Sequence, residues 1–255
     1  MKLNYKVSGS GEPLIILHGL FGMLDNWQTV GKKLEKYFTV YLIDQRNHGR
    51  SPHDDLHSYP AMADDLNEFL IQTGISSANI LGHSMGGKTA MQFALKYPKE
   101  IKKLIVVDMG IKRYPGGHEE IMDALLSIDL KTVHYRADAE KVLLNKIPNF
   151  SVRQFLLKSL QRNPDGSYSW KFNLDALYNN YEENILTEIN STHVFSGETL
   201  FISGGKSPYI IKEDWSKIQL LFPNAQWKII ENAGHWVHAE QPDLLIDEIV
   251  KFIND

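Results

Sequence analysis

One short motif constrains this chain more than any other stretch, and it reads Gly82-His83-Ser84-Met85-Gly86-Gly87. The motif lies directly between the apolar pair Ile80-Leu81 and a helical pattern over residues 88–94. A serine at a sharp strand-to-helix turn is held in a strained backbone conformation, and the glycines around it let the two elements approach closely. A glycine-rich turn capped by serine is the alternative interpretation. The strand–turn–helix context favours Ser84 as an activated nucleophile.

The period of the apolar residues predicts alternating strands and helices over the first 110 positions. Short, branched apolar runs expected to be buried strands lie at 14–17, 39–43, 79–81 and 104–107. Amphipathic patterns predict helices at 62–73 and 85–97, the second closed by Pro98. The alternating polar and apolar residues 1–7 are typical of a further strand, not of a signal peptide. Such alternation of strands and helices predicts a mostly parallel, twisted sheet that is covered on both faces.

The pattern changes between residues 111 and 196, where we expect helices and no convincing strand. The helical segments are 121–126, 139–147, 152–160 and 174–181. Strand patterns return at 199–202 and 227–230, followed by a terminal amphipathic helix that carries Leu244 and Phe252. We therefore predict an α/β core of residues 1–110 and 197–255, interrupted by a helical cap, or lid, of residues 111–196.

Composition excludes several classes of protein. With 43% hydrophobic and 23% charged residues, the 255-residue chain can bury a sizeable core and is not a disordered chain. Its net charge of -4 argues against a nucleic-acid partner. The absence of cysteine excludes disulfides, thiolate nucleophiles and cysteine metal sites. No apolar run approaches the roughly 18 to 20 residues of a membrane helix. We expect a cytoplasmic protein without membrane insertion, as a monomer or homodimer.

A serine hydroxyl is a poor nucleophile unless a nearby base takes its proton, so one of the ten histidines must lie beside Ser84. His235 follows the last predicted strand in Asn232-Ala233-Gly234-His235-Trp236 and precedes the terminal helix. The chain order serine, acid, histidine agrees with this choice. The alternative is a loop histidine with local hydrogen bonds only. His238 has a weaker claim, and we expect it at the surface or in a supporting position.

The third member of the site should be a carboxylate that orients the imidazole and stabilises its charged form. The turn after strand 199–202 carries Ser207, which cannot hold that charge. Asp108 ends the strand 104–107, at the carboxyl edge where ligand sites of such sheets gather. We predict Asp108 as the acid and keep Asp214 as the next candidate. A strand-end aspartate that caps the following turn is the alternative interpretation.

Acyl-transfer chemistry also needs two fixed backbone N–H groups that bind a developing oxyanion. We predict that these belong to Met85, after the serine, and Leu20, in His18-Gly19-Leu20-Phe21-Gly22. Taken alone, that segment would be only a tight turn, and His18 is predicted to be structural. We predict that aromatic residues line the substrate pocket, although aromatic residues at helical spacing more often belong to the core. The candidates are Phe21, Trp170, Phe172, Tyr181 and Trp236.

Two loops that contain histidine are weaker candidates. The segment 44–51, Asp44-Gln45-Arg46-Asn47-His48-Gly49-Arg50-Ser51, could be a metal or phosphate loop. A structural turn in which its aspartate and arginine pair is the better interpretation. The segment 53–57 superficially resembles a zinc motif, but it lies between two prolines and lacks the helix and glutamate that such a motif needs. We predict no metal and no cofactor.

These motifs together resemble the α/β-hydrolase superfamily, and within it the YbfF-type esterases and their eukaryotic α/β-hydrolase-domain relatives. The motifs are H-G-L-F-G, D-Q-R-N-H-G-R-S, G-H-S-M-G-G-K, V-V-D-M-G and G-H-W-V-H-A-E. The likeness runs almost end to end, with Asn47-His48 and Lys88 as its more specific features and residues 111–196 as its least matched part. It implies the α/β-hydrolase fold and an acid after the strand that follows the nucleophile, in agreement with Asp108.

The resemblance implies a serine hydrolase, without a cofactor, that cleaves carboxylic esters through a Ser-His-Asp triad and an acyl-enzyme. The predicted substrates are small acyl esters of short to medium chain length, with acyl-CoA thioesters as a further option. Two alternatives stay open. The same triad could cleave a C–C bond or perform a related acyl transfer, because one fold hosts many chemistries. A non-catalytic ligand receptor is a third hypothesis.

Overall fold

The computed structural model describes residues 1–255, and seven strands form one sheet through its centre. The strand order is β1-β3-β2-β4-β5-β8-β9, and every neighbouring pair is parallel except β1 with β3. The strands are β1 (Tyr5–Ser8), β2 (Pro13–Leu17), β3 (Thr39–Ile43), β4 (Ala78–His83), β5 (Ile101–Val107), β8 (Thr199–Gly204) and β9 (Ala225–Ile230). This mostly parallel sheet confirms the predicted fold class.

Helices cover both faces of the sheet, because its central strands are apolar on both sides. In β2, Ile15 and Leu17 join one buried cluster, whereas Leu14 and Ile16 join the other. The first cluster includes residues of α2 (Tyr59–Thr73) and α3 (Met85–Lys96), and the second includes residues of α1 (Gln28–Leu34) and α10 (Pro242–Asn254). Further elements of the core are α8 (Trp215–Leu221), α9 (Val237–Glu240) and 3-10 turns at Leu24–Trp27, Pro98–Glu100 and Lys212–Asp214.

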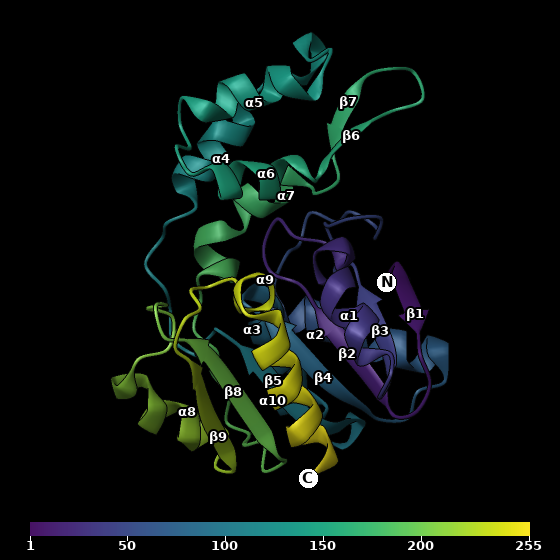
Figure 1. Cartoon of the computed structure of the whole chain (residues 1–255), viewed down its shortest axis with the longest axis vertical. Coiled ribbons are helices and arrows are strands. Elements are labelled where there is room, and N and C mark those ends of the chain that lie inside the picture. Colours follow the sequence, from purple (N-terminus) through teal and green to yellow (C-terminus); the bar gives the residue numbers. More distant parts are fainter.

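Residues 111–196, which we call the insertion, leave the core after β5 and return before β8. Figure 1 shows the insertion standing beyond the edge of the sheet where β2, β4 and β5 end. Its elements are α4 (Glu119–Leu126), a 3-10 turn (Leu130–Thr132), α5 (Arg136–Leu144), α6 (Phe150–Leu157), β6 (Leu160–Arg162), β7 (Tyr168–Trp170), α7 (Leu174–Asn179) and a π-helical turn (Tyr181–Ile185). No helix of the whole structure has both the length and the apolar character needed to cross a bilayer.

The expectation that the insertion holds no strand is wrong, because β6 and β7 form an antiparallel hairpin. The hairpin turn is Asn163-Pro164-Asp165-Gly166, in which Gly166 has φ +88° and the Gly166 N–H donates to the Asn163 carbonyl. Proline, aspartate and glycine in this order are a turn signal with a known backbone preference. Each strand has only three residues, which is too short for alternation to be recognised in the sequence.

Candidate active site

Ser84 occupies a strained turn between β4 and α3. Its backbone has φ 54° and ψ -122°, outside the regions that most residues adopt, and such strain costs roughly 1 to 3 kcal/mol. The surrounding glycines make this turn possible. A Cβ on Gly82 would lie 2.0 Å from the carbonyl oxygen of Gly86, and a Cβ on Gly86 would lie 2.4 Å from that of Leu17. The predicted sharp strand-to-helix turn is therefore present at Ser84.

Three side chains from separate parts of the sequence form one hydrogen-bonded chain at the carboxyl edge of the sheet. The Nε2 atom of His235 lies 3.0 Å from the Ser84 Oγ atom, and its Nδ1 atom lies 2.7 Å from Asp108 Oδ2. Because a carboxylate can only accept, Nδ1 carries the imidazole proton and Nε2 faces the serine hydroxyl as an acceptor. The structure thus brings together the three residues that the sequence singled out.

Asp108 is fully buried directly after β5, with φ +48°. Besides His235, its carboxylate accepts a hydrogen bond from the Gly204 N–H (3.0 Å) and one from the Ser207 hydroxyl. From the sequence, Ser207 is only a residue that cannot replace the acid, whereas in the structure its hydroxyl hydrogen-bonds to the acid. The other candidate, Asp214, lies elsewhere and pairs with Lys112 at 2.6 Å.

Aromatic rings enclose His235. The Tyr209 ring stacks on its imidazole, with ring centroids 4.0 Å apart and planes 16° apart. On another side, His83 Nε2 hydrogen-bonds to the His235 carbonyl at 2.8 Å. His238, expected at the surface or in a supporting position, stacks on Trp27 with centroids 4.5 Å apart. Burial lowers the pKa of His238 to about 3, so its ring is uncharged near neutral pH. His238 therefore packs beside the site as a neutral ring.

Two backbone N–H groups beside Ser84 are available for a ligand. Met85 is the first residue of α3, so its N–H has no carbonyl partner within the helix and carries part of the positive end of the helix dipole. The N–H of Leu20 makes none of the backbone hydrogen bonds found in its loop. A Cβ on the preceding Gly19 would lie 3.2 Å from the Ser84 Cβ atom, so this loop packs directly against the serine.

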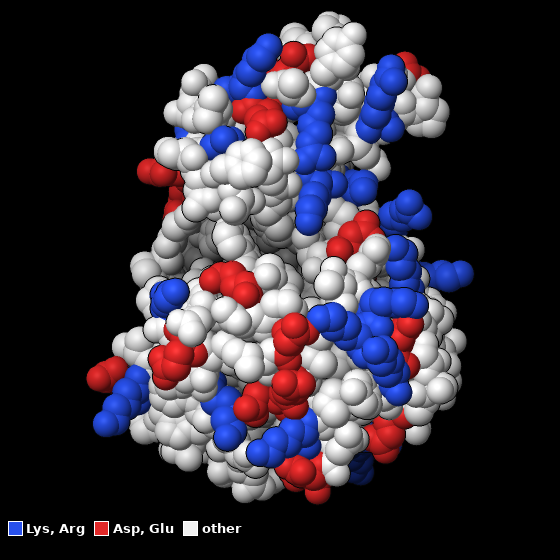
Figure 2. All heavy atoms as spheres, viewed as in Figure 1, with Lys and Arg blue, Asp and Glu red and all other residues white.

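Two cavities meet at Ser84, between the core and the insertion. The smaller, of about 100 Å³, is lined by residues that include Phe21, His235 and Trp236. The larger, of about 400 Å³, includes Tyr181 and extends to Tyr59 and Lys88. Leu20, Ser84 and His118 line both. Figure 2 shows the surface hollowed where the insertion meets the core.

Not all of the predicted pocket aromatics line these cavities. Phe21, Tyr181 and Trp236 do, whereas Trp170 and Phe172 do not. The last two stack on each other at 5.2 Å and 8° within the insertion, and Phe172 packs on Phe21 at 5.3 Å. The prediction is therefore corrected for Trp170 and Phe172, whose aromatic spacing reflects packing of the insertion.

His118 is a site residue that the sequence does not reveal; it lies directly before α4 and lines both cavities. Its backbone N–H donates to the Tyr181 hydroxyl at 3.0 Å, and its Nδ1 lies 2.9 Å from the same oxygen. Burial lowers the pKa of His118 to about 4, so the ring is neutral at physiological pH. No motif surrounds His118, and only the fold brings it to Ser84.

Lys88 is a fully buried cation with no carboxylate partner. From α3, its ammonium donates hydrogen bonds to the carbonyls of Lys112 (2.9 Å) and Thr187, where the chain enters and leaves the insertion. The Tyr114 ring lies 4.9 Å from the Nζ atom. Desolvation lowers the pKa of Lys88 to about 7. Lys88 therefore ties both connections of the insertion to the core. When its ammonium is charged, the loss of hydration lowers the stability of the folded state.

We expect a Lys88→Met variant to change how stability depends on pH. In the parent, Lys88 has a folded-state pKa of about 7, below the ordinary lysine value of about 10.4, so the unfolded chain binds more protons between these pH values. Charging Lys88 therefore destabilises the parent at pH 6 to 7, and this cost fades as pH rises toward about 10. Relative to the parent, the Met variant should become steadily less stable over this range.

Urea denaturation at pH 6.5, 8 and 9.5 measures this difference in unfolding free energy. Lys141→Met, at an exposed lysine of α5, is the matched control. Loss of the two hydrogen bonds of Lys88 shifts the unfolding free energy by the same amount at every pH. The change of the difference with pH measures the titration of the Lys88 ammonium. A Lys88→Met difference that stays level with pH would contradict the interpretation.

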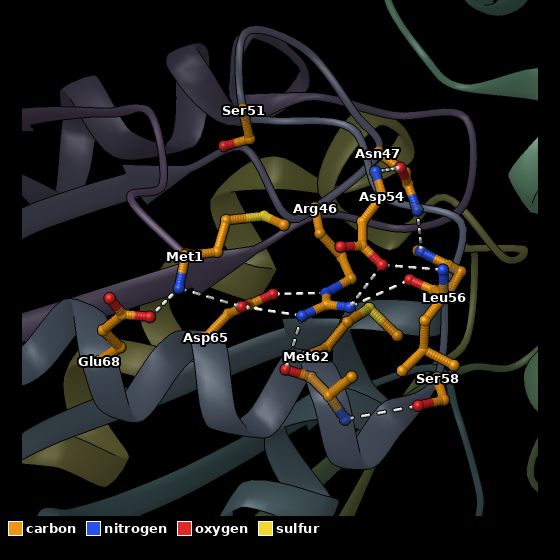
Figure 3. A network of polar contacts seen from close by, with 12 residues as sticks. Met1, Arg46, Asn47, Ser51, Asp54, Leu56, Ser58, Met62, Asp65 and Glu68 are labelled. Carbon is orange, nitrogen blue, oxygen red and sulfur yellow. Dashed lines mark hydrogen bonds and ion pairs between the residues drawn. The ribbon is translucent and has the colours of Figure 1, made fainter.

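The loop of residues 44–57 is fixed to neighbouring elements by polar contacts. Its segment 44–51 is a structural turn, but the charges of that turn pair differently from the prediction. Arg46 does not pair with Asp44; it binds Asp65 of α2 through Nε (2.5 Å) and Nη2 (2.9 Å), as Figure 3 shows. Asp44 instead accepts from the backbone N–H of Leu24 and of Arg50. Arg46 therefore ties the loop to α2, and Asp44 ties it to the 3-10 turn that begins at Leu24.

Comparison with known proteins agrees with this architecture. A model of the family described as alpha/beta hydrolase fold matches residues 12–242. The sn-1-specific diacylglycerol lipase ABHD11 of Mus musculus is 38% identical over 248 residues, which cover 94% of this chain and 80% of that protein. Esterase YbfF of Escherichia coli is 34% identical over 261 residues, and the match covers 100% of this chain and 100% of that protein.

A solved structure titled marine microorganism esterase superposes with a TM-score of 0.96 at 45% sequence identity, covering 98% of this chain and 99% of that chain. Its likeness extends through the insertion as well as the sheet, since nearly all of both chains is matched. Taken with the strand order and the turn at Ser84, these matches show that the chain belongs to the alpha/beta hydrolase fold family.

Proposed function

We propose that this protein is a serine hydrolase of carboxylic esters, with Ser84 as nucleophile, His235 as base and Asp108 as the acid that orients it. The observation that carries the proposal is the unbroken chain Ser84 Oγ, His235 Nε2, His235 Nδ1 and Asp108 Oδ2, with links of 3.0 and 2.7 Å. The esterase and lipase names of the relatives support the same reaction class. Geometry of this kind is the recognised requirement for an activated serine.

The proposed reaction has two acyl-transfer steps. His235 takes the hydroxyl proton as Ser84 Oγ attacks the ester carbonyl carbon, and the resulting oxyanion accepts from the N–H groups of Leu20 and Met85. His235 then donates its proton to the leaving alcohol as the C–O bond breaks, which leaves an acyl-serine. A water molecule, deprotonated by the same imidazole, attacks the acyl-serine, and Ser84 regains its proton as the acid departs.

The two cavities suggest how an ester would lie. They extend from Ser84 in two directions, so one can hold the acyl group and the other the alcohol. The larger, of about 400 Å³, lies within the common range for small-molecule sites of roughly 300 to 1,000 Å³ and ends at buried Tyr59 and Lys88. We propose acyl chains of short to medium length, with the insertion serving as a cap and thioesters as further substrates.

A substrate panel tests this function. Purified protein is assayed with p-nitrophenyl esters of two to sixteen carbons, acyl-CoA thioesters and a vinylogous diketone that reports C–C cleavage. We expect turnover of the esters, highest for short to medium chains. Turnover of the diketone without the esters would favour C–C hydrolysis on the same side chains. Ligand-induced stabilisation without product would indicate a receptor.

Ser207 gives a finer test of the proposed acid. Removing its hydroxyl with Ser207→Ala takes one donor from the buried Asp108 carboxylate but leaves those of Gly204 and His235. We expect kcat to fall about 3- to 10-fold, the cost of roughly 1 kcal/mol for one hydrogen bond. Steady-state kinetics measures the effect, and Ser207→Thr, which keeps the hydroxyl, is the control. A parent-like kcat in Ser207→Ala would show that this bond does not support catalysis.

A further inference from the structure

The turn that presents the Leu20 N–H is held by two hydrogen bonds to the Gly19 carbonyl. The Gly22 N–H donates to the Gly19 carbonyl (3.0 Å), and His18 Nδ1 lies 2.8 Å from the same oxygen. In a trans peptide the carbonyl and the next N–H point in opposite directions. Fixing the Gly19 carbonyl on one side therefore aims the Leu20 N–H to the other.

Phe21, the next residue of the turn, is in an unfavourable backbone conformation. Its φ is +59°, a region that usually holds glycine or asparagine at this place in a turn. Two hydrogen bonds hold its peptide groups: the Phe21 N–H donates to His48 Nε2 (3.2 Å), and its carbonyl accepts from the Ser159 hydroxyl (3.2 Å). The strained residue is thus held by the core on one side and by the insertion on the other.

His48 can act only as a neutral acceptor at this position. Its Nδ1 lies 2.9 Å from the Arg46 carbonyl, which cannot donate, so Nδ1 carries the proton and Nε2 accepts from Phe21. The ring is fully buried, and desolvation together with His18 and His57 holds its pKa well below the usual value. His48, of the Asn47-His48 pair that distinguishes the sequence motif, therefore holds the Phe21 N–H in the turn of residues 19–22.

The insertion touches the same turn and the same loop through further contacts. The Asn173 N–H donates to the Asn47 carbonyl at 2.9 Å, and its Nδ2 atom lies 3.3 Å from Asn47 Oδ1. The Phe172 ring packs on Phe21. Any shift of the insertion away from the core would break these bonds and the Ser159 bond, and would release the strained turn.

We propose that His48 and Ser159 are positioning residues that hold the Phe21 peptide groups, and so aim the Leu20 N–H at the oxyanion. The insertion is then part of the chemistry as well as a cover for the substrate, because its seating on the core sets how well the transition state is stabilised. This inference rests on the proposed function, since it assumes an oxyanion beside Ser84. His48 would then position the Leu20 N–H without touching the reacting atoms.

Four variants separate this role from a general structural one. His48→Phe keeps a ring but removes the acceptor, whereas His48→Gln keeps an acceptor near the Nε2 position. Ser159→Ala removes the bond from the insertion. His53→Phe is the matched control, at an exposed histidine of the same loop. Each is assayed for kcat and KM with a p-nitrophenyl ester, for inhibition by a trifluoromethyl ketone that forms a tetrahedral adduct, and for melting temperature.

We expect kcat of His48→Phe to fall about 10- to 100-fold with KM nearly unchanged, because misplacement of a transition-state donor by about 1 Å costs on this order. The ketone should bind more weakly by a similar factor. His48→Gln should recover most of the kcat, Ser159→Ala should lose about 3- to 10-fold, and His53→Phe should match the parent.

The outcomes distinguish this inference from the proposed function. If the parent neither hydrolyses esters nor reacts with the ketone, the proposed function fails first. If the parent is active, a His48→Phe variant with parent kcat, or with a loss confined to KM, overturns the role of His48. Equal losses in His48→Phe and His48→Gln also overturn it. If His48→Phe does not fold, Ser159→Ala decides: a 3- to 10-fold loss of kcat with KM unchanged supports the proposal, and parent kcat in this variant overturns it.

Discussion

Replacing Ser84 with alanine is expected to lower kcat for ester hydrolysis by about five to six orders of magnitude, as loss of a triad nucleophile does in serine hydrolases. Without the Oγ atom there is no acyl-enzyme, and only water held near the N–H groups of Leu20 and Met85 can attack the ester. The fold should be retained, because the hydrogen bond to His235 is the only side-chain bond found for Ser84. Initial rates and intact-mass spectrometry after fluorophosphonate treatment measure both effects.

The parent should gain the mass of one phosphonyl group, and Ser84→Ala should gain none. Ser151→Ala, at an exposed serine of α6, is the matched control and should react like the parent. A phosphonyl adduct on folded Ser84→Ala would place the reactive hydroxyl elsewhere. No adduct on the folded parent would reject the activated serine and favour a ligand receptor.

Replacing Asp108 with asparagine is expected to cost about 10⁴-fold in kcat, the loss known for this change in a serine protease triad. Asp108 accepts from His235, Gly204 and Ser207, whereas an asparagine in its place has a single oxygen acceptor. An amide that faces Nδ1 with its NH₂ group would hold the imidazole in the wrong tautomer, with the proton on Nε2. His235 could then no longer take the proton of Ser84.

Asp214→Asn is the control for this experiment, because Asp214 is the other acid that the sequence left open. Its carboxylate pairs with Lys112 and does not contact His235, so we expect kcat near that of the parent. Rates measured from pH 6 to 9 with both variants check the assignment. A parent-like rate in Asp108→Asn together with a large loss in Asp214→Asn would reassign the acid.

The sheet could be predicted from the sequence because its signals are local and strong. Buried parallel strands are uninterrupted apolar runs, and each predicted run lies within an observed strand. The helices α1 and α8 were missed, since each has only seven residues and gives little periodic signal. The elbow at Ser84 was predictable because its glycine motif lies between a predicted strand and a predicted helix, and the glycines permit the close approach that such a turn needs.

Asp108 could be predicted as the acid from its place at the end of an apolar strand, but its contact with His235 depends on geometry that no local pattern contains. The sheet order places the end of β5 between β4 and β8, and this brings Asp108 within reach of His235. The aromatics of the insertion show the same limit, since Trp170 and Phe172 stack within it while Tyr181 reaches the cavity. The spacing of aromatic residues along the chain does not show which neighbouring element covers each ring.

By itself the sequence determined the parallel sheet, the strained serine turn and the small set of acids, bases and N–H donors that could serve it. Those features follow from residue types and their spacing, which act over a few positions. Only the tertiary structure decided that Ser207 supports Asp108, that Lys88 ties both ends of the insertion, and that His48 and Ser159 hold Phe21 from opposite sides. Each of these bonds joins residues far apart in the chain, and hydrogen bonds form between such residues only where folding has brought donor and acceptor within about 3 Å.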